Sequence, residues 1–167
     1  MKKIVQGYSG LFAIAGVVAI LDQWTKFWVH QNLRLGEVYR PDLWLTSIAR
    51  FVHVKNAGAV FGLFQNFGGV ITIFYFVVGA GILFYFPRVP PQDRLVRLSM
   101  GLYLGGAIGN LIDRLTYGYV TDFISLGVLP VFNIADFSIS LGAVLFIAGI
   151  LANEKRQKIR GGSSPTT

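Results

Sequence analysis

The chain has 167 residues, of which 53% are hydrophobic and only 14% are charged, and its mean hydropathy is +0.57. This is one domain's worth of sequence, and its polar residues are too few to cover a globule in water, which argues against a soluble protein. The sequence contains no cysteine, so disulfides, thiol catalysis and thiolate metal sites are excluded.

Four apolar runs suit helices that cross a bilayer, whose hydrocarbon core is ~30 Å thick. The run at 67–86 carries no charge, and the first run is interrupted only by Asp22 and Lys26. We expect membrane-spanning helices at 8–29, 67–86, 95–115 and 134–152. With two outer connections, 30–66 and 116–133, they make up one transmembrane domain over residues 1–153.

The positive charge lies on one side of this predicted membrane protein. The basic residues near the two ends and between the second and third spans are Lys2, Lys3, Arg88, Arg94, Arg97, Lys155, Arg156, Lys158 and Arg160. Cytoplasmic segments are enriched in lysine and arginine, so we expect both termini in the cytoplasm. The net charge of +7 is then explained by the basic residues on the cytoplasmic side of the membrane. Binding of nucleic acid is not needed to explain it, so nucleic acid is not expected as a partner. Residues 154–167 are predicted to be a basic, disordered cytoplasmic tail.

The outer connections contain segments that are typical of strands. Val, Phe and Tyr are frequent at 38–40 and 50–54, with breaks at Gly36 and Pro41, and the stretch 118–132 is similar. We therefore expect a small sheet on the outer face of the membrane. Aromatic side chains that suit the level of the lipid headgroups are Trp24, Trp28, Tyr39 and Trp44.

The third predicted span carries glycine at every fourth position, at Gly101, Gly105 and Gly109. A helix face that carries only glycine at these positions allows the backbone of a neighbouring helix to approach closely. We interpret these glycines as packing residues, in preference to a catalytic role.

Half of the acidic residues lie at one depth, near the outer ends of the predicted spans: Asp22, Asp113, Asp122 and Asp136. An ionisable group in hydrocarbon costs at least ~2.5–3.5 kcal/mol on insertion scales, so each of these carboxylates needs a reason to be there. This clustering is the most informative feature of the sequence.

Two of the four aspartates have a local explanation. Asp22 precedes Lys26 by one helical turn, in the favourable order for an ion pair on one helix face. Asp113 is next to Arg114 and within a turn of Asn110, so these three residues can form a self-contained polar cluster. For Asp22 and Asp113 we favour a structural role over catalysis.

Asp122 and Asp136 have no such local partner. Asp136 could be a simple helix N-terminal acid, but that does not explain Asp122, which lies in an extended apolar stretch. An antiparallel return from the third span to the fourth would bring the two carboxylates together. Two carboxylates that share a site cannot both ionise cheaply, so one keeps its proton. The pair then supplies an acid and a base, as in aspartic proteases.

Other chemistries have less support. The two histidines, His30 and His53, do not form an H-E-x-x-H motif, and there is no G-x-S-x-G or P-loop motif. No metal or other cofactor is expected. A Ser–Lys dyad, with Lys26 or Lys55 near Ser47, stays open. A proton-coupled transporter is the main alternative from another class, although no inverted repeat supports it, and a non-catalytic membrane assembly factor is the second.

Five motifs occur in order along the chain: DQWTK at 22–26, NAGAVFG at 56–62, GGAIGNLIDR at 105–114, VTDF at 120–123 and FNIAD at 132–136. Together they resemble the lipoprotein signal peptidases, the bacterial signal peptidase II family. Thr121 stands where many members have an aliphatic residue, and Val60 stands where alanine is usual.

The resemblance implies a membrane all-α fold, a bundle of four transmembrane helices with a small extracytoplasmic β-cradle and a short helical arm over the active site. It implies an aspartic endopeptidase of the bacterial inner membrane that is inhibited by globomycin and cleaves diacylglyceryl-modified prolipoproteins before the lipidated cysteine. The sequence does not fix the oligomeric state, and we expect a monomer. Membrane lipid is expected to surround the helix bundle. The catalytic residues would be Asp122 and Asp136. The residues expected to bind substrate or support the site are Asp22, Lys26, Asn56, Gly58, Asn110, Asp113, Arg114 and Asn133.

Overall fold

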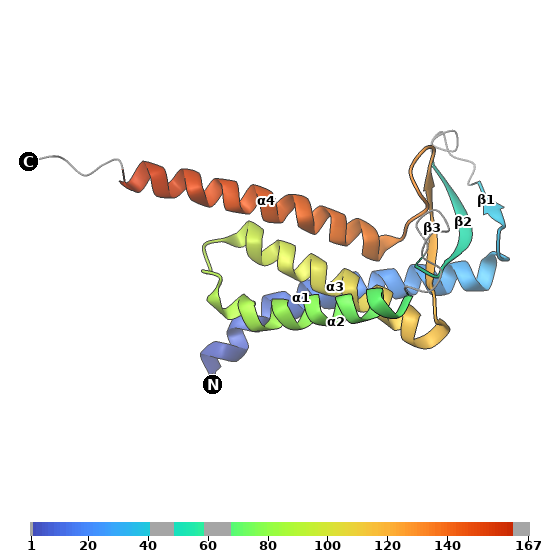
Figure 1. The fold of residues 1–167 in the computed structure, drawn as a ribbon, viewed down its shortest axis with the longest axis horizontal. Helices are drawn as coiled ribbons and strands as arrows, with labels where there is room; N and C mark the ends of the chain where they lie inside the picture. Colours follow the sequence, from blue (N-terminus) through green and yellow to red (C-terminus); the bar gives the residue numbers. More distant parts are fainter. Residues whose placement is uncertain (1, 41–48, 59–67, 162–167) are drawn as a thin grey trace, which may run out of the picture.

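The computed structural model describes residues 2–40, 49–58 and 68–161 (Figure 1). Within them are four long helices: α1 (Lys2–Asn32), α2 (Gly68–Tyr85), α3 (Arg94–Tyr117) and α4 (Ile134–Gly161). All four are long and apolar enough to cross a membrane, over Tyr8–Asn32, Gly69–Arg88, Arg94–Tyr117 and Ile134–Arg156. The four predicted spans are thereby confirmed as helices.

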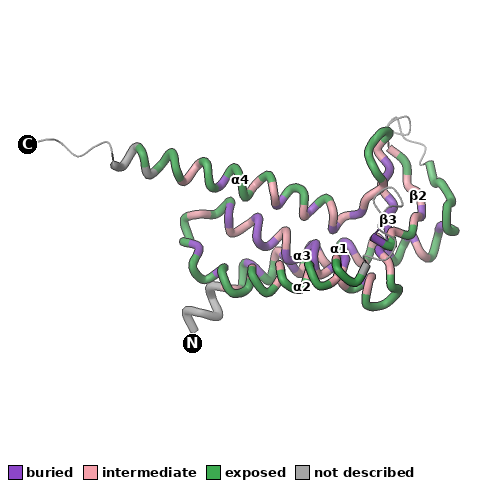
Figure 2. Tube along the Cα trace, in the orientation of Figure 1, coloured by how far each residue is buried: buried purple, intermediate pink, exposed green. Residues whose placement is uncertain are grey.

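Helix α3 is the centre of the bundle. In its membrane-spanning segment 56% of the residues are buried, against 11% for α2, and it contacts α1, α2 and α4 (Figure 2). Its bounds follow from the sequence. Pro90 and Pro91 precede the helix, and Gly118 ends it in the left-handed conformation, φ +79°, donating its N–H to the carbonyl of Arg114 at 3.0 Å.

The glycines of α3 provide the close helix approach that their spacing predicts. A Cβ atom on Gly105 would lie 2.6 Å from Cβ of Val18 and 2.7 Å from the carbonyl oxygen of Ala15, so α1 could not keep its position. On the other side of α3, a Cβ on Gly106 would lie 2.5 Å from the carbonyl oxygen of Ala135 on α4. Helix α3 is therefore held between α1 and α4 at contact distances that larger residues would not allow.

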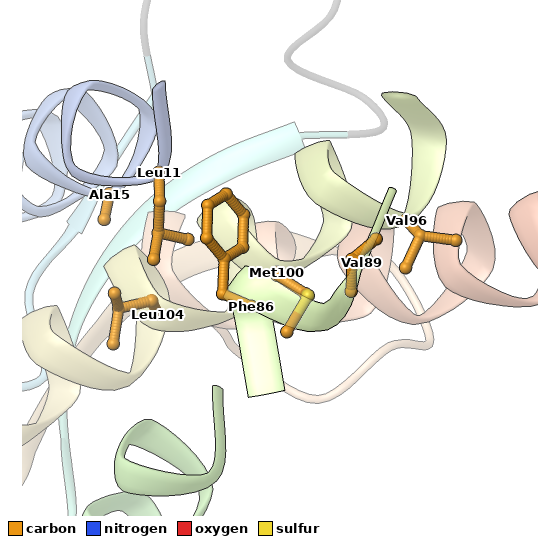
Figure 3. Close-up of a cluster of buried hydrophobic side chains, with 7 residues drawn as sticks. All are labelled: Leu11, Ala15, Phe86, Val89, Val96, Met100 and Leu104. Atoms are coloured by element: carbon orange, nitrogen blue, oxygen red, sulfur yellow. The ribbon is translucent and has the colours of Figure 1, made fainter. Parts of the chain in front are cut away.

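Apolar side chains fill the bundle and also cover its outside. Figure 3 shows the main buried cluster, which comes from α1, α3 and the short 3₁₀ helix η2 (Phe86–Arg88) with the residue after it: Leu11, Ala15, Phe86, Val89, Val96, Met100 and Leu104. The outer faces of α2 and α4 instead expose large apolar side chains, among them Ile73, Phe74, Val77, Val144, Ile147 and Leu151. Such surfaces are stable in contact with lipid, in agreement with the predicted membrane location.

A sheet of three antiparallel strands lies across one end of the bundle (Figure 1). Its order is β1 (Val38–Tyr39), β2 (Ala49–Asn56) and β3 (Val120–Leu126). Strand β3 pairs Asp122 with Val54 of β2, and the register of β2 is irregular between Phe51 and Val54. The strands predicted in the two outer connections are confirmed. We call this end of the bundle the sheet end; α1 begins and α4 finishes at the opposite end (Figure 1).

Helix α4 is longer than the sequence predicts, and one expected element lies outside the described residues. Helix α4 continues to Gly161, so the prediction of a disordered tail from residue 154 is wrong for 154–161. This segment is rich in Glu, Lys, Arg and Gln, which favour helix, and its basic residues suit a helix C-terminus. The short helical arm that the resemblance implies is not formed by 33–40 or 49–58 and lies outside the described residues.

Candidate active site

At the sheet end, polar side chains from α1, α3, α4 and the sheet meet in an otherwise apolar protein. Those with at most 2% of their surface exposed are Asp22, Lys26, Asn110, Asp113, Thr121, Asp122 and Asn133. Buried polar groups are tolerated only when they are paired or hydrogen-bonded. The contacts of each residue therefore show how the site is held together.

The ion pair that the spacing predicts on α1 is present. The ammonium of Lys26 lies 2.7 Å from Oδ2 of Asp22, and it also lies 3.4 Å from Oδ2 of Asp113 on α3. The other oxygen of Asp22 accepts a hydrogen bond from the backbone N–H of Ala135 at the start of α4, at 2.9 Å. This buried ionic cluster thus joins three helices.

Asp113 and Arg114 do not form the self-contained cluster that their adjacency suggested. Asp113 interacts with Lys26 and accepts a hydrogen bond from the backbone N–H of Thr121 at 2.7 Å. The guanidinium of Arg114 instead lies over the ring of Tyr75, 5.2 Å from its centroid. Adjacent residues on a helix point about 100° apart, so the tertiary neighbours of Asp113 take precedence over Arg114.

Asn110 connects the ionic cluster to one of the two remaining aspartates. Its carbonyl oxygen accepts a hydrogen bond from the ammonium of Lys26 at 3.0 Å. Its amide nitrogen donates to Oδ1 of Asp136 at 2.7 Å. Because each end of the amide has a different charged partner, the orientation of the Asn110 side chain is fixed by both.

Asn133 connects the two aspartates that sequence analysis selected. Its carbonyl oxygen accepts a hydrogen bond from the backbone N–H of Asp136 at 2.9 Å, which is the N-cap interaction that begins α4. Its amide nitrogen donates to Oδ1 of Asp122 at 2.7 Å and to the carbonyl of Asn110 at 3.2 Å. The chain return from α3 to α4 therefore brings Asp122 and Asp136 to one small polar network.

The first outer connection also reaches this network. Asn56, the last residue of β2, donates a hydrogen bond to Oδ2 of Asp122 at 2.8 Å. The backbone N–H of Gly58 donates to the side-chain carbonyl of Asn56 at 2.9 Å, with Gly58 at φ +95°, a conformation that favours glycine. Of the two residues expected in the site, Asn56 is thus placed beside Asp122, and Gly58 holds the side chain of Asn56.

The environment of Asp122 changes its proton affinity. Burial, followed by the charge of Asp136, raises the pKa of Asp122 from 3.8 to about 7, against hydrogen bonds from Asn56 and Asn133 that lower it. An aspartate with this pKa can hold a proton at neutral pH and release it within the working range of an enzyme.

Sequence analysis missed two members of the site. Gln23 donates from its amide nitrogen to the backbone carbonyl of Gly109 at 3.0 Å and to Asp113 at 3.1 Å. The hydroxyl of Tyr75 on α2 lies 3.3 Å from the amide nitrogen of Asn110. The position of Gln23 inside a polar motif was an available signal, whereas nothing local distinguishes Tyr75 from other span aromatics. In the described part of the chain, no group of three His, Asp or Glu side chains could hold a metal ion.

Fold and site together define a helical membrane protein with two carboxylates, buried Asp122 and half-buried Asp136, that asparagine side chains link at one end of its bundle. The family model described as "Signal peptidase (SPase) II" matches residues 14–152. The chain therefore belongs to the signal peptidase II family, which confirms the resemblance drawn from the five motifs.

Relatives and solved structures agree with this assignment. The chain is 41% identical over 135 residues to the lipoprotein signal peptidase of Moorella thermoacetica, covering 79% of this chain and 86% of the relative. It is 35% identical over 160 residues to that of Anoxybacillus flavithermus, covering 92% of each. A solved bacterial membrane enzyme, 25% identical, superimposes with a TM-score of 0.80 over 94% of each chain, and a second, 27% identical, with 0.76 over 84% of this chain and 92% of that one.

Proposed function

We propose that this peptidase is an aspartic endopeptidase in which Asp122 and Asp136 are the catalytic residues. The observation that carries the proposal is the network of Asn110 and Asn133, which links the two carboxylates, together with burial that raises the pKa of Asp122 to about 7. The raised pKa of Asp122 supports Asp122 as the proton donor of the pair near neutral pH. Acid–base hydrolysis of a peptide bond requires such a donor.

The roles of the two residues follow from this choice of proton donor. Asp136, whose Oδ1 accepts a hydrogen bond from the amide of Asn110, is the base that takes a proton from the attacking water. Asp122 donates a hydrogen bond to the scissile carbonyl, where negative charge develops, and then protonates the departing amine. After cleavage Asp136 holds the proton taken from water and Asp122 has lost its own, so transfer of this proton from Asp136 to Asp122, directly or through water, restores the starting state.

The substrate we propose is a diacylglyceryl-modified prolipoprotein, cut on the N-terminal side of its lipidated cysteine. Relatives of this chain carry the name lipoprotein signal peptidase. A signal peptide in helical form hides its carbonyls in backbone hydrogen bonds, so it has to be extended at the site. Asp122 lies on β3, so the described sheet stands beside the place where the extended peptide would be cut.

The membrane orientation we propose puts this site at the outer face of the bacterial cytoplasmic membrane. The positive charge near both termini and between α2 and α3 supports cytoplasmic termini. The acyl chains of the substrate, at ~0.8 kcal/mol per buried CH₂, would hold the modified cysteine at the same depth as the aspartates.

The proposal is tested by incubating the purified protein with a lipidated precursor and with the same precursor lacking the diacylglyceryl group. We expect cleavage of the lipidated form alone, at the bond before the cysteine, and its inhibition by globomycin. Equal cleavage of both precursors would show that the enzyme does not require the diacylglyceryl group on its substrate. Cleavage of neither by folded protein would overturn the proposed function.

Cleavage is expected to decrease as the pH rises above about 7. The pKa of Asp122 is about 7, so its proton, which the mechanism needs, is lost over this range, and kcat/KM should fall about tenfold per pH unit. The same raised pKa makes the folded state bind more protons than the unfolded chain. The stabilisation that the folded state gains from this proton on Asp122 is complete below pH 3.8 and is lost as the pH rises through about 7. A kcat/KM that is constant from about pH 7 to about pH 9 would contradict a proton on Asp122.

A further inference from the structure

Thr121, the residue before Asp122, is held from three sides. It is fully buried, and its backbone N–H donates to Asp113 at 2.7 Å while its carbonyl accepts from Asn133 at 3.3 Å. Those two bonds use the peptide groups and would be available to any residue. The third bond joins the Thr121 hydroxyl to Nε2 of His30 at 2.9 Å, and it needs a hydroxyl side chain.

His30 is itself fixed in place by two aromatic rings. It lies in the last turns of α1, with the His53 ring of β2 at a centroid distance of 4.9 Å, edge to face, and the Tyr117 ring of α3 at 5.0 Å. His53 in turn donates from Nδ1 to the carbonyl of Leu33 at 2.9 Å. Three elements therefore hold the His30 imidazole with its Nε2 directed at Thr121.

Packing alone does not account for this arrangement. An apolar side chain at position 30 would also fill the space between the His53 and Tyr117 rings, but it would leave the buried Thr121 hydroxyl without the partner seen here, at a cost of about 1–3 kcal/mol. An apolar residue at 121 would avoid that cost. The combination of a histidine and a threonine makes sense if the hydrogen bond between them has its own role.

We propose that His30 is a positioning residue for Asp122 and acts through the hydroxyl of Thr121. Successive side chains of a strand point to opposite faces, so a restraint on the Thr121 side chain sets the direction of Asp122 on the other face. A displacement of about 1 Å in a reacting group can cost about 10²-fold in rate. This inference rests on the proposed catalytic role of Asp122.

The test compares kcat and KM for cleavage of the lipidated precursor. We expect His30→Ala and Thr121→Val each to lower kcat about tenfold with KM unchanged within about twofold, because substrate binding is retained while the acid is misplaced. The double variant should be no worse than either single one, since both remove the same bond. His30→Gln, whose amide nitrogen can take the place of Nε2, should restore most of kcat, and so should Thr121→Ser.

Two controls separate positioning from loss of stability. Gln31→Ala, at the exposed neighbouring position, should retain wild-type kcat and KM. If His30→Ala does not fold, the comparison of Thr121→Val with Thr121→Ser decides, because valine keeps the shape of threonine without its hydroxyl, whereas serine keeps the hydroxyl without the methyl group. Wild-type kcat in Thr121→Val, or independent effects that multiply in the double variant, would overturn the inference. The catalytic role of Asp122, on which this inference rests, is tested separately: normal cleavage by Asp122→Asn would contradict that role.

Discussion

Asp122→Asn and Asp136→Asn, made separately, are each expected to abolish cleavage of a lipidated precursor, with kcat reduced by at least about 10²–10⁴-fold. An amide has nearly the size of a carboxyl group but cannot carry the shared proton between water and the leaving amine. The rate is measured with purified variants in detergent or lipid. Normal cleavage by either variant would exclude that residue from the catalytic pair.

The same variants should remain folded, which makes their loss of activity interpretable. Asparagine is nearly isosteric with aspartate and removes one of two neighbouring acidic groups, whose mutual repulsion raises the pKa of Asp122, so the melting temperature should not fall substantially. The double variant should be no slower than the slower single one, because residues that act as one unit are not additive. Asp93→Asn, the same chemical change at the opposite end of α3, is the matched control and should cleave at the wild-type rate.

The spans and the strands could be predicted because each depends on local sequence. Bilayer thickness dictates the length of an apolar helix, and the four long helices agree with the runs read from hydropathy. The cost of placing a carboxylate in hydrocarbon made the aspartates conspicuous. Asp122 and Asp136 were then singled out because neither has a partner within a turn of chain, and the structure places both in one network.

The partners inside the network could not be predicted from spacing. Asp113 pairs with Lys26 of α1, not with its neighbour Arg114, because the approach of α1 to α3 decides which groups meet. That approach depends on Gly109, where an added Cβ would lie 2.5 Å from Oδ2 of Asp22. Asn133 presented a similar difficulty, since an asparagine can be a helix cap, a carboxylate ligand or both, and only the fold shows that it is both.

Lys26→Met is expected to have the largest effect on stability, a loss of about 3–5 kcal/mol. Lys26 is 2% exposed and supplies the positive charge beside two buried carboxylates, those of Asp22 and Asp113. Methionine fills a similar volume but leaves both carboxylates without a countercharge in a protein interior that lies in or near hydrocarbon. The unfolding free energy in mixed micelles, measured by titration with a denaturing detergent, gives the size of the loss.

We expect the loss of stability in Lys26→Met to come from the unpaired carboxylates and not from poorer packing. Two further variants separate these causes. Adding Asp22→Asn and Asp113→Asn to Lys26→Met removes the uncompensated charges and should recover most of the stability, because a neutral, hydrogen-bonded cluster costs less than unpaired carboxylates. Lys55→Met, at an exposed position of β2 where the ammonium lies over the Tyr119 ring, should change stability by less than about 1 kcal/mol. If the triple variant is as unstable as Lys26→Met alone, the lysine stabilises the bundle through its packed side chain, and the ionic cluster is incidental to the fold.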